Sequence, residues 1–193
     1  MGRHKIIEDE ELLNHARRLF VSKGASISTK EIALSANISQ ATLFQRFPTK
    51  EALFRAAMIP PKPEVDSIIG AGAHCSDPQQ ALVEISGAIL DYFRAMMPIA
   101  VQLMLHPVVT VQEMKGEFQR NNPAILIQGL AMYLNSLNQT GRAKINDPRA
   151  SAGLLIAAIH SLALFELMGL HEELFLRETL AASVAALWSG MQV

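Results

Sequence analysis

The sequence predicts an all-α protein in which a small N-terminal head of three helices precedes a larger helical body. Asp77-Pro78, Asn122-Pro123 and Asp147-Pro148 each pair a residue that caps helix N-termini with a proline, which favours the first helical position. Each pair precedes a long stretch with apolar residues at helical spacing, and another such stretch runs from about 172 to 192. No convincing strand pattern of alternating apolar and polar residues appears between turn residues. We therefore expect at least four helices in the body.

The head is predicted to contain three short helices and the start of a fourth. The first has an acidic first turn, which suits the helix dipole, and stops at Gly24. The second starts at Ser28, where Glu31 three residues later completes a capping-box pattern. The expected helices run from about 9 to 23, from 28 to a turn near 37, from 39 to about 47, and from 49 to about 59.

The composition is that of a globular protein of the cell interior. Half of the 193 residues are hydrophobic and 18% are charged, which is enough apolar material for a core. The single cysteine, Cys75, cannot form a disulfide within the chain, and this favours a reducing compartment. No signal peptide is visible, and the longest uncharged apolar run, 150–165, is short for a membrane span. We expect a cytoplasmic protein with no membrane partner.

Prolines and charge divide the chain at the same place. Pro60-Pro61-Lys62-Pro63 must end any helix, so it separates a predicted head, 1–58, from a predicted body, 59–193. The head holds nine Lys and Arg against six Asp and Glu, whereas the body holds eight against twelve. A basic head on an acidic body favours binding of a polyanion at one end only.

The second and third helices of the head form a helix-turn-helix pattern between 28 and 47. Small and apolar residues stand where two short helices close on each other across a turn around Asn37, namely Ile32, Ala33, Ala36, Ile38 and Leu43. In proteins with this motif the second helix enters the major groove of DNA. A plain helical hairpin with a solvated polar face produces the same pattern, so the residues alone leave both interpretations open.

The outward face expected for the third helix carries side chains of the kinds that a DNA-reading helix needs. Glutamine pairs with adenine, arginine pairs with guanine, and an alanine or threonine methyl group contacts the methyl group of thymine. The residues on this face are Gln40, Ala41, Thr42, Gln45 and Arg46. The backbone N–H groups that follow Ser39 suit a phosphate. Thr29, Lys30 and Lys50 flank the face as candidate contacts to the DNA backbone.

Many separate positions in the first third of the chain agree in order and spacing with one known pattern. They are LLNHARRLF at 12–20, Lys23-Gly24, Ile32-Ala33, Ser39 and TLFQRFPTKEAL at 42–53. This pattern resembles the TetR family of transcriptional regulators. The resemblance implies an all-α homodimer with a DNA-binding head and a ligand-binding, dimerising body, most often a repressor that a small molecule releases from DNA. Carried over position by position, it marks Thr29, Gln40, Ala41, Thr42, Phe44, Gln45, Arg46 and Lys50 as DNA contacts, to which the residues themselves add Ser28, Lys30 and Ser39.

The chain departs from the TetR pattern at the turn and on the third helix. Asn37 stands where glycine is usual, and asparagine tolerates the left-handed conformation, so the turn should survive. Phe44 replaces the usual tyrosine and lacks its hydroxyl. Gln40-Ala41 replaces the usual lysine-glycine pair. We therefore expect fewer generic phosphate contacts and a base preference that depends more on Thr42, Gln45 and Arg46.

The last two helices are predicted to form the dimer interface. Residues 149–170 are apolar nearly all round, which a helix on the surface of a monomer does not tolerate, and the final helix is rich in Ala and Ser, which permits close packing. Two such helices from each subunit would form a four-helix bundle, as the resemblance implies. Twofold symmetry then makes the operator roughly palindromic. The alternative is that these helices fill the core of one subunit.

A pocket for a small apolar or weakly polar effector is expected in the body. Flexible methionines and a few aromatic or polar side chains suit such a pocket, although methionines also fill ordinary cores. The candidate lining residues are Met97, Met104, Tyr133, His160, Phe165 and Met168.

Enzyme chemistry has no support in the sequence. The six histidines show no metal-ligand spacing, Cys75 has only His74 beside it, and no glycine-rich phosphate loop is present. We therefore expect no catalytic residue, no metal and no cofactor. An activator, a regulator controlled by a protein partner, and a dimeric binding protein whose head has lost DNA affinity remain as alternatives, with a small-molecule enzyme as the remotest.

Overall fold

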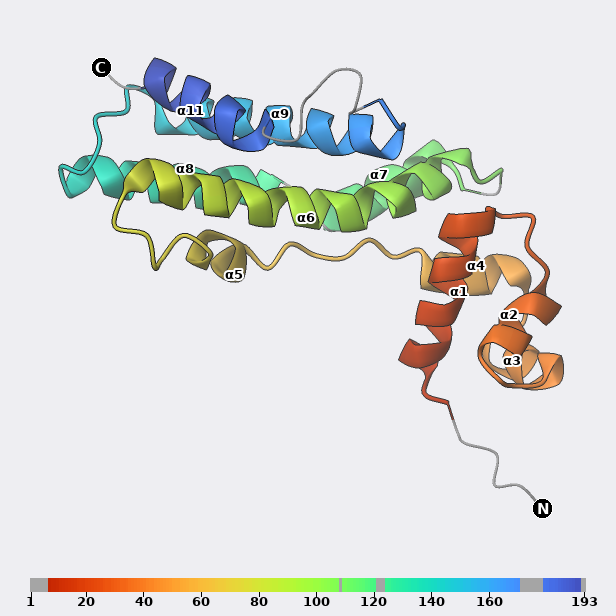
Figure 1. Ribbon diagram of the computed structural model, residues 1–193. Helices are drawn as coiled ribbons and strands as arrows, with labels where there is room; N and C mark the ends of the chain where they lie inside the picture. The colour runs from red at the N-terminus through yellow and green to blue at the C-terminus, as the bar shows by residue number, and fades with distance from the viewer. Residues whose placement is uncertain (1–6, 108, 121–123, 171–178, 192–193) are drawn as a thin grey trace. The chain divides into compact units, whose positions relative to one another are not determined.

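The computed structural model describes residues 7–107, 109–120, 124–170 and 179–191. Throughout these segments the chain forms α-helices joined by loops and has no β-strand, which confirms the all-α prediction (Figure 1). The chain divides into two compact units. The N-terminal unit comprises residues 1–60 and 98–117, and the body unit comprises residues 61–97 and 118–193. The N-terminal unit therefore contains a segment that the predicted head, 1–58, does not include.

Four helices lie in the first segment, 1–60, of the N-terminal unit. They are α1 (Asp9–Lys23), α2 (Thr29–Ser35), α3 (Gln40–Arg46) and α4 (Lys50–Ala57). Each begins within about a residue of its predicted start, because its capping signal is local to the sequence. Helix α1 contacts both α2 and α4, and α2 contacts α3. Their buried side chains form one core, in which the ring of Phe20 meets that of Phe54 edge to face at 5.0 Å.

The end of a long helix completes this core. Helix α6 (Pro78–Leu105) contains Pro98, and its last turns bring Ile99 and Leu103 into the same buried cluster as the head helices. Just beyond the helix, the ring of His106 stacks on Phe54 with a centroid distance of 3.8 Å. Partial burial lowers the pKa of His106, so the neutral ring is favoured in this stack.

Helix α7 (Val111–Arg120) is fastened to the N-terminal unit by a carboxylate at its first turn. Glu113 accepts hydrogen bonds from the backbone N–H and hydroxyl of Thr110 at 2.8 and 2.9 Å, which caps the helix. The same carboxylate forms a 2.6 Å ion pair with Arg55 of α4. These hydrogen bonds, led by the backbone donor of Thr110, hold the pKa of Glu113 below its usual value.

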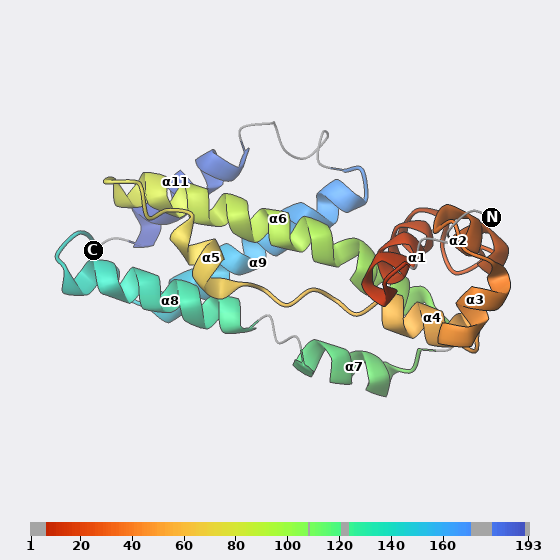
Figure 2. The same ribbon diagram turned by 90° about the horizontal axis from the view of Figure 1, so that it is seen from below.

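The body unit is a packed set of longer helices. Helix α8 (Ala124–Gln139) contacts α5 (Val65–Gly70) and α9 (Pro148–Leu167), and α9 contacts α11 (Thr179–Met191) (Figures 1 and 2). Gly129 permits the close approach of α5 and α8, since a side chain there would collide with Val65. Arg94 of α6 binds Glu166 of α9 through two hydrogen bonds, of 2.7 and 2.8 Å. Helices α6 and α9 are also long and apolar enough to cross a membrane by length and composition alone.

The predicted helix starts in the body can be compared directly with these elements. Helices α6 and α9 begin at the predicted prolines, and Asp147 caps α9 by accepting from the backbone N–H groups of Arg149 and Ala150. The predicted start at Asn122-Pro123 lies outside the described residues, as does the first part of the predicted stretch 172–192. The sequence did not predict α5, which has only six residues, or α7 as a separate helix.

Leu103 offers a test of whether α6 belongs to the N-terminal core. Leu103→Ala removes a side chain that is 5% exposed, and should lower the free energy of unfolding by about 2–5 kcal/mol. Urea unfolding of the full chain, followed by circular dichroism, measures the change. The matched control is Leu105→Ala, two residues further along the same helix, where the side chain is 73% exposed and the change should stay within about 0.5 kcal/mol. Equal effects of the two variants would contradict this packing.

Candidate nucleic-acid interface

The start of α2 is fixed by a reciprocal capping box. The backbone N–H of Glu31 donates to the Ser28 hydroxyl at 3.2 Å, and the backbone N–H of Ser28 donates to the Glu31 carboxylate at 3.2 Å. Lys23 at the end of α1 pairs with the same carboxylate at 3.1 Å. The Lys23 hydrogen bond, followed by those from Ser28, lowers the pKa of Glu31. The ionised carboxylate therefore holds the helix start predicted at Ser28.

The turn between α2 and α3 uses a left-handed residue. Asn37 has a φ of 54°, which confirms that asparagine adopts here the conformation for which glycine is usual. The backbone N–H of Ile38 donates to the carbonyl of Ala33 at 3.0 Å, closing the turn. Ser39 then caps α3 by accepting from the backbone N–H of Thr42 at 3.0 Å. The turn thus sets the direction in which α3 leaves α2.

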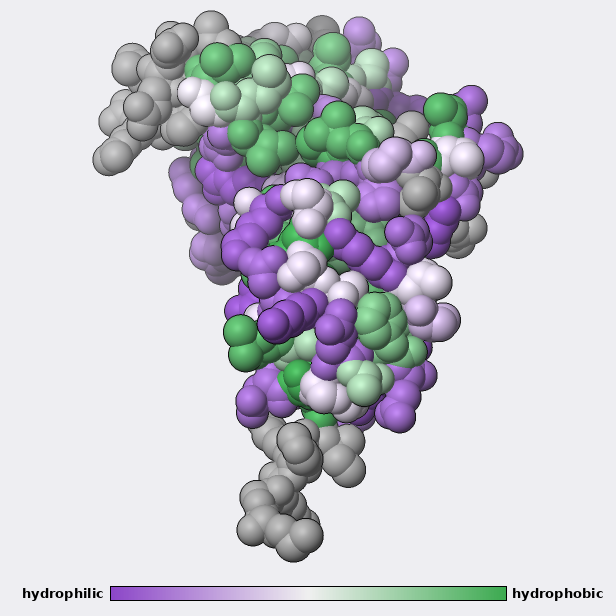
Figure 3. Space-filling model, turned by 90° about the vertical axis from the view of Figure 1, so that its right-hand side faces the viewer, coloured by the Kyte–Doolittle hydropathy of each residue, from purple (hydrophilic) through white to green (hydrophobic). Residues whose placement is uncertain are grey.

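Helix α3 has one buried side and one exposed side. Leu43 is fully buried in the core, whereas Gln40, Ala41, Phe44 and Gln45 are exposed. Figure 3 views the side of the molecule on which α2 and α3 lie in Figure 1. Hydrophilic side chains dominate the middle and lower parts of this view, with some hydrophobic ones among them, and hydrophobic side chains gather in the upper part. The exposed side of α3 can therefore meet a large polar partner without rearrangement.

Two of the residues predicted to contact DNA are hydrogen-bonded to each other. The side-chain amide of Gln40 donates to the hydroxyl of Thr29 at 2.8 Å, and Thr29 is only 8% exposed. This bond ties the first turn of α3 to the first turn of α2. Ser28, Lys30 and Ser39 are exposed, while Thr42 and Lys50 are half-buried.

Arg46, the last residue of α3, is turned towards α1. Its Nη1 donates to the backbone carbonyl of Ile7 at 2.6 Å and to the carboxylate of Asp9 at 3.0 Å. Its side chain is 24% exposed. No local signal in the sequence indicates these partners, because they lie 37 and 39 residues away along the chain. All the predicted contacts thus lie on α2, α3 and the helix starts around them, but Thr29, Gln40 and Arg46 also make bonds within the protein.

The predicted effector residues are divided between the two units of the chain. Met104 belongs to the N-terminal unit and is exposed, whereas the other five belong to the body unit. There, Met97 is buried, Met168 is exposed, and Tyr133 and Phe165 are half-buried. The ring of His160 packs edge to face on Phe93 at 5.2 Å, and the loss of solvent lowers the pKa of His160. The set stays a prediction, and none of the six lines either of the two hollows that follow.

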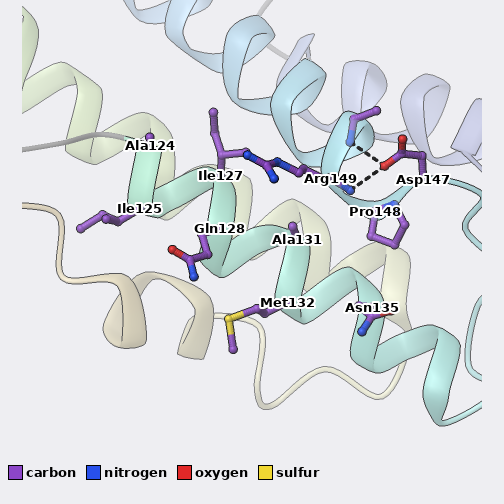
Figure 4. Close-up of a pocket in the computed structure, with 11 residues that line it drawn as sticks. Ala124, Ile125, Ile127, Gln128, Ala131, Met132, Asn135, Asp147, Pro148 and Arg149 are labelled. Carbon is purple, nitrogen blue, oxygen red and sulfur yellow. Dashed lines mark hydrogen bonds between the residues drawn. The ribbon is translucent and has the colours of Figure 1, made fainter.

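Two hollows of the body unit are lined by other residues. The larger is an open groove of about 1030 Å³ along α8 and the start of α9, and Figure 4 shows the Arg149 side chain stretched towards Ile127 there. Its lining comprises Ala124, Ile125, Ile127, Gln128, Ala131, Met132, Asn135, Asp147, Pro148, Arg149 and Ala150. The smaller hollow, of about 170 Å³, lies between α9 and α11. The described residues contain no cluster of three His, Cys, Asp or Glu side chains that could hold a metal ion.

Two family models match most of the chain. Residues 12–57 match the model described as bacterial regulatory proteins, tetR family, and residues 80–186 match the AefR-like transcriptional repressor, C-terminal domain. The chain belongs to the TetR family of transcriptional regulators. The resemblance found in the sequence is therefore confirmed. TetR-family proteins are DNA-binding regulators with a helix-turn-helix head and a ligand-binding body, so DNA is a partner of this chain.

Solved structures of the TetR family share the fold at low sequence identity. A putative TetR-family regulator from Mesorhizobium loti is 18% identical, with 96% of each chain covered and a TM-score of 0.67. Salmonella enterica GusR is 20% identical, with 98% of this chain and 99% of that chain covered and a TM-score of 0.63. FadR from Bacillus subtilis, solved with stearoyl-CoA, is 13% identical, with 96% and 98% covered and a TM-score of 0.62. A search of the curated proteins found no match.

Proposed function

We propose that this TetR-family regulator is a cytoplasmic repressor that binds a palindromic operator as a homodimer. The observation that carries the proposal is the two-sided α3, in which the buried Leu43 seats the helix and the opposite side presents Ala41, Phe44 and Gln45. Alanine and phenylalanine supply apolar contacts for thymine methyl groups, and glutamine supplies the paired donor and acceptor that match adenine.

Phosphate contacts complete the proposed interface. The Ser39 cap leaves the first backbone N–H groups of α3 near the exposed surface, where they suit a phosphate. Lys30 on α2 and Lys50 at the start of α4 supply the cations on either side. Among the described residues these two lysines are the proposed phosphate-binding cations, so their contribution to the salt dependence of binding should be modest.

DNA binding is tested directly with the full chain. In a gel-shift assay it should bind a duplex from the promoter beside its own gene with about a thousandfold higher affinity than a random duplex. The logarithm of the affinity should fall linearly with the logarithm of the salt concentration. Gln45→Glu replaces the amide that would pair with adenine by a carboxylate, which the negative charge of DNA repels. This change should weaken binding at least about tenfold. The same change at Gln139, an exposed residue of α8 outside the groove, is the matched control and should leave the affinity unaltered. Equal affinity for the promoter and random duplexes would reject a specific regulator.

We place the dimer interface on α9 and α11. Leu154 of α9 is 64% exposed in the single chain, and several other exposed residues of α9 and α11 are small. The exposed small residues are Ala150, Ala157, Ala158, Ala181, Ala182 and Ala186. Small side chains let helices from two subunits approach closely, and burial of Leu154 removes its apolar surface from water.

The interface is tested by a charge on α9. Leu154→Glu buries a carboxylate without a partner in the proposed interface, so it should convert the dimer to a monomer in size-exclusion chromatography with light scattering. Met104→Glu, at another exposed apolar residue on α6, is the matched control and should stay dimeric. A Leu154→Glu variant that remains fully dimeric would place the interface elsewhere.

We propose that a small molecule with a long apolar part releases the repressor from DNA. The α8 groove supports this proposal, since its lining is mostly apolar and its volume of about 1030 Å³ is that of a large ligand site. Arg149, together with Gln128 and Asn135, supplies a few polar groups that would orient such a molecule. FadR, which has this fold, was solved with stearoyl-CoA and so makes an acyl-CoA the first compound to try.

Stearoyl-CoA should raise the melting temperature and release the DNA. At a concentration a hundred times its Kd, a ligand that binds only the native state should raise the melting temperature by roughly 5–10 °C. CoA alone is the control for the apolar chain. Ala131→Trp fills the groove and should abolish both effects while DNA binding persists. A full response in Ala131→Trp would move the site away from the groove, and no response in the unaltered chain would reject an acyl-CoA effector.

A further inference from the structure

Arg46 joins the end of α3 to the chain at the start of α1. The guanidinium reaches the backbone carbonyl of Ile7, one residue before the Glu8 cap of α1, and the carboxylate of Asp9 in the first turn. Ile7 is itself buried in the core of the N-terminal unit. We infer that Arg46 is a positioning residue, which fixes the orientation of the DNA-reading helix and does not itself read a base. This inference rests on the proposed DNA binding.

The length of α3 explains why such a fastening is needed. The helix has seven residues, and isolated helices of that length are unstable in water. Leu43 is its only fully buried residue, and Ile38 and Phe47 just outside its two ends are partly buried against the same core. This small apolar contact leaves a share of the orientation of α3 to polar bonds at the two ends.

Each end of α3 has a bond to a different helix. At the first turn the Gln40 amide donates to the buried Thr29 of α2 at 2.8 Å. At the last residue Arg46 donates to Ile7 and Asp9 beside α1 at 2.6 and 3.0 Å. The two attachments stand on either side of Leu43, and the exposed residues Ala41, Phe44 and Gln45 lie between them. The pair of end bonds therefore sets the angle at which these three residues are presented.

The charges around Arg46 also argue against a direct role in DNA contact. Asp9 is an acidic partner, and its carboxylate offsets the cation that would otherwise attract phosphate. Glu8, Glu10 and Glu11 beside it are all exposed and acidic. An arginine that turned to read guanine would first break its bonds to Ile7 and Asp9 and would leave the acidic turn without its cationic partner.

Arg46→Ala separates positioning from base reading and from phosphate contact. If α3 loses its fixed angle, fewer molecules hold the binding geometry, and the affinity for every duplex should fall by the same factor, roughly tenfold. The base preference measured by selection from random duplexes should not change. The slope of log affinity against log salt should not change either, because no phosphate contact is lost. Backbone amides of α3 should exchange hydrogen faster in the DNA-free protein.

Two further variants sharpen the test. Gln45→Ala, the neighbour that has a predicted base contact, is the matched control and should lose preference at one base pair while α3 exchange stays as it was. Asp9→Ala should weaken binding when Arg46 is present and have less effect in Arg46→Ala, since the two residues act through one bond. This coupling distinguishes positioning from a general loss of stability, which would make the two effects additive.

Opposite results would overturn the inference. Loss of preference confined to one base pair in Arg46→Ala would assign the residue to base reading. A salt slope reduced by about one would assign it to a phosphate. Unaltered exchange in α3 would show that Arg46 fixes nothing. Failure of the unaltered chain to bind any duplex would reject the proposed function, whereas exchange of α3 in the DNA-free protein would still decide the role of Arg46.

Discussion

The N-terminal unit depends on the packing of one aromatic ring, that of Phe54. It meets Phe20 of α1 edge to face and stacks on His106 just after α6, so one buried side chain of α4 joins three parts of the chain. Aromatic pairs of this kind stabilise beyond their buried area because their geometry is specific. The helix-turn-helix is built on the core around this ring through Ile32 and Leu43. The position of α3 therefore depends on the packing of this aromatic cluster.

The division of labour within α3 follows from this arrangement. Its fully buried contribution to the core is a single leucine, and in the proposed interface its other side must stay available to DNA. A helix in this situation cannot gain orientation from more burial without losing readable surface. Polar bonds at the helix ends, through Gln40 and Arg46, resolve the conflict because they use residues at the margins of the reading surface.

Local sequence signals predicted most helices of the head but few of the contacts between residues that are distant in the sequence. The caps at Ser28, Ser39 and Thr49 act within three residues, so the sequence alone located the starts of three helices to within about a residue. The partners of Arg46 could not be predicted, because Ile7 and Asp9 are distant in the sequence and are brought to Arg46 only by the tertiary fold. The place of residues 98–117 in the N-terminal unit was missed for the same reason.

The effector residues show a different limit of sequence reasoning. Methionine and aromatic content indicates material for a pocket but gives no direction, and Met97 and Met104, seven residues apart on α6, differ completely in exposure. The groove that the structure contains is lined largely by small and aliphatic residues of α8, which carry no signal that separates them from ordinary helix surface.

The shared helix α6 has a consequence for how such regulators can be recombined. Part of the core of the N-terminal unit is encoded after residue 97. A chimera that joins residues 1–60 to a foreign body therefore loses Ile99 and Leu103 and has the donor's side chains in their place. The foreign side chains must then fit Phe20, Leu53 and Phe54. A chimera that keeps the N-terminal unit intact must therefore take both of its segments, 1–60 and 98–117, which are separated in the sequence by residues 61–97 of the body unit. Exchange of specificity between relatives by a single crossover is accordingly restricted to pairs whose α6 ends are alike.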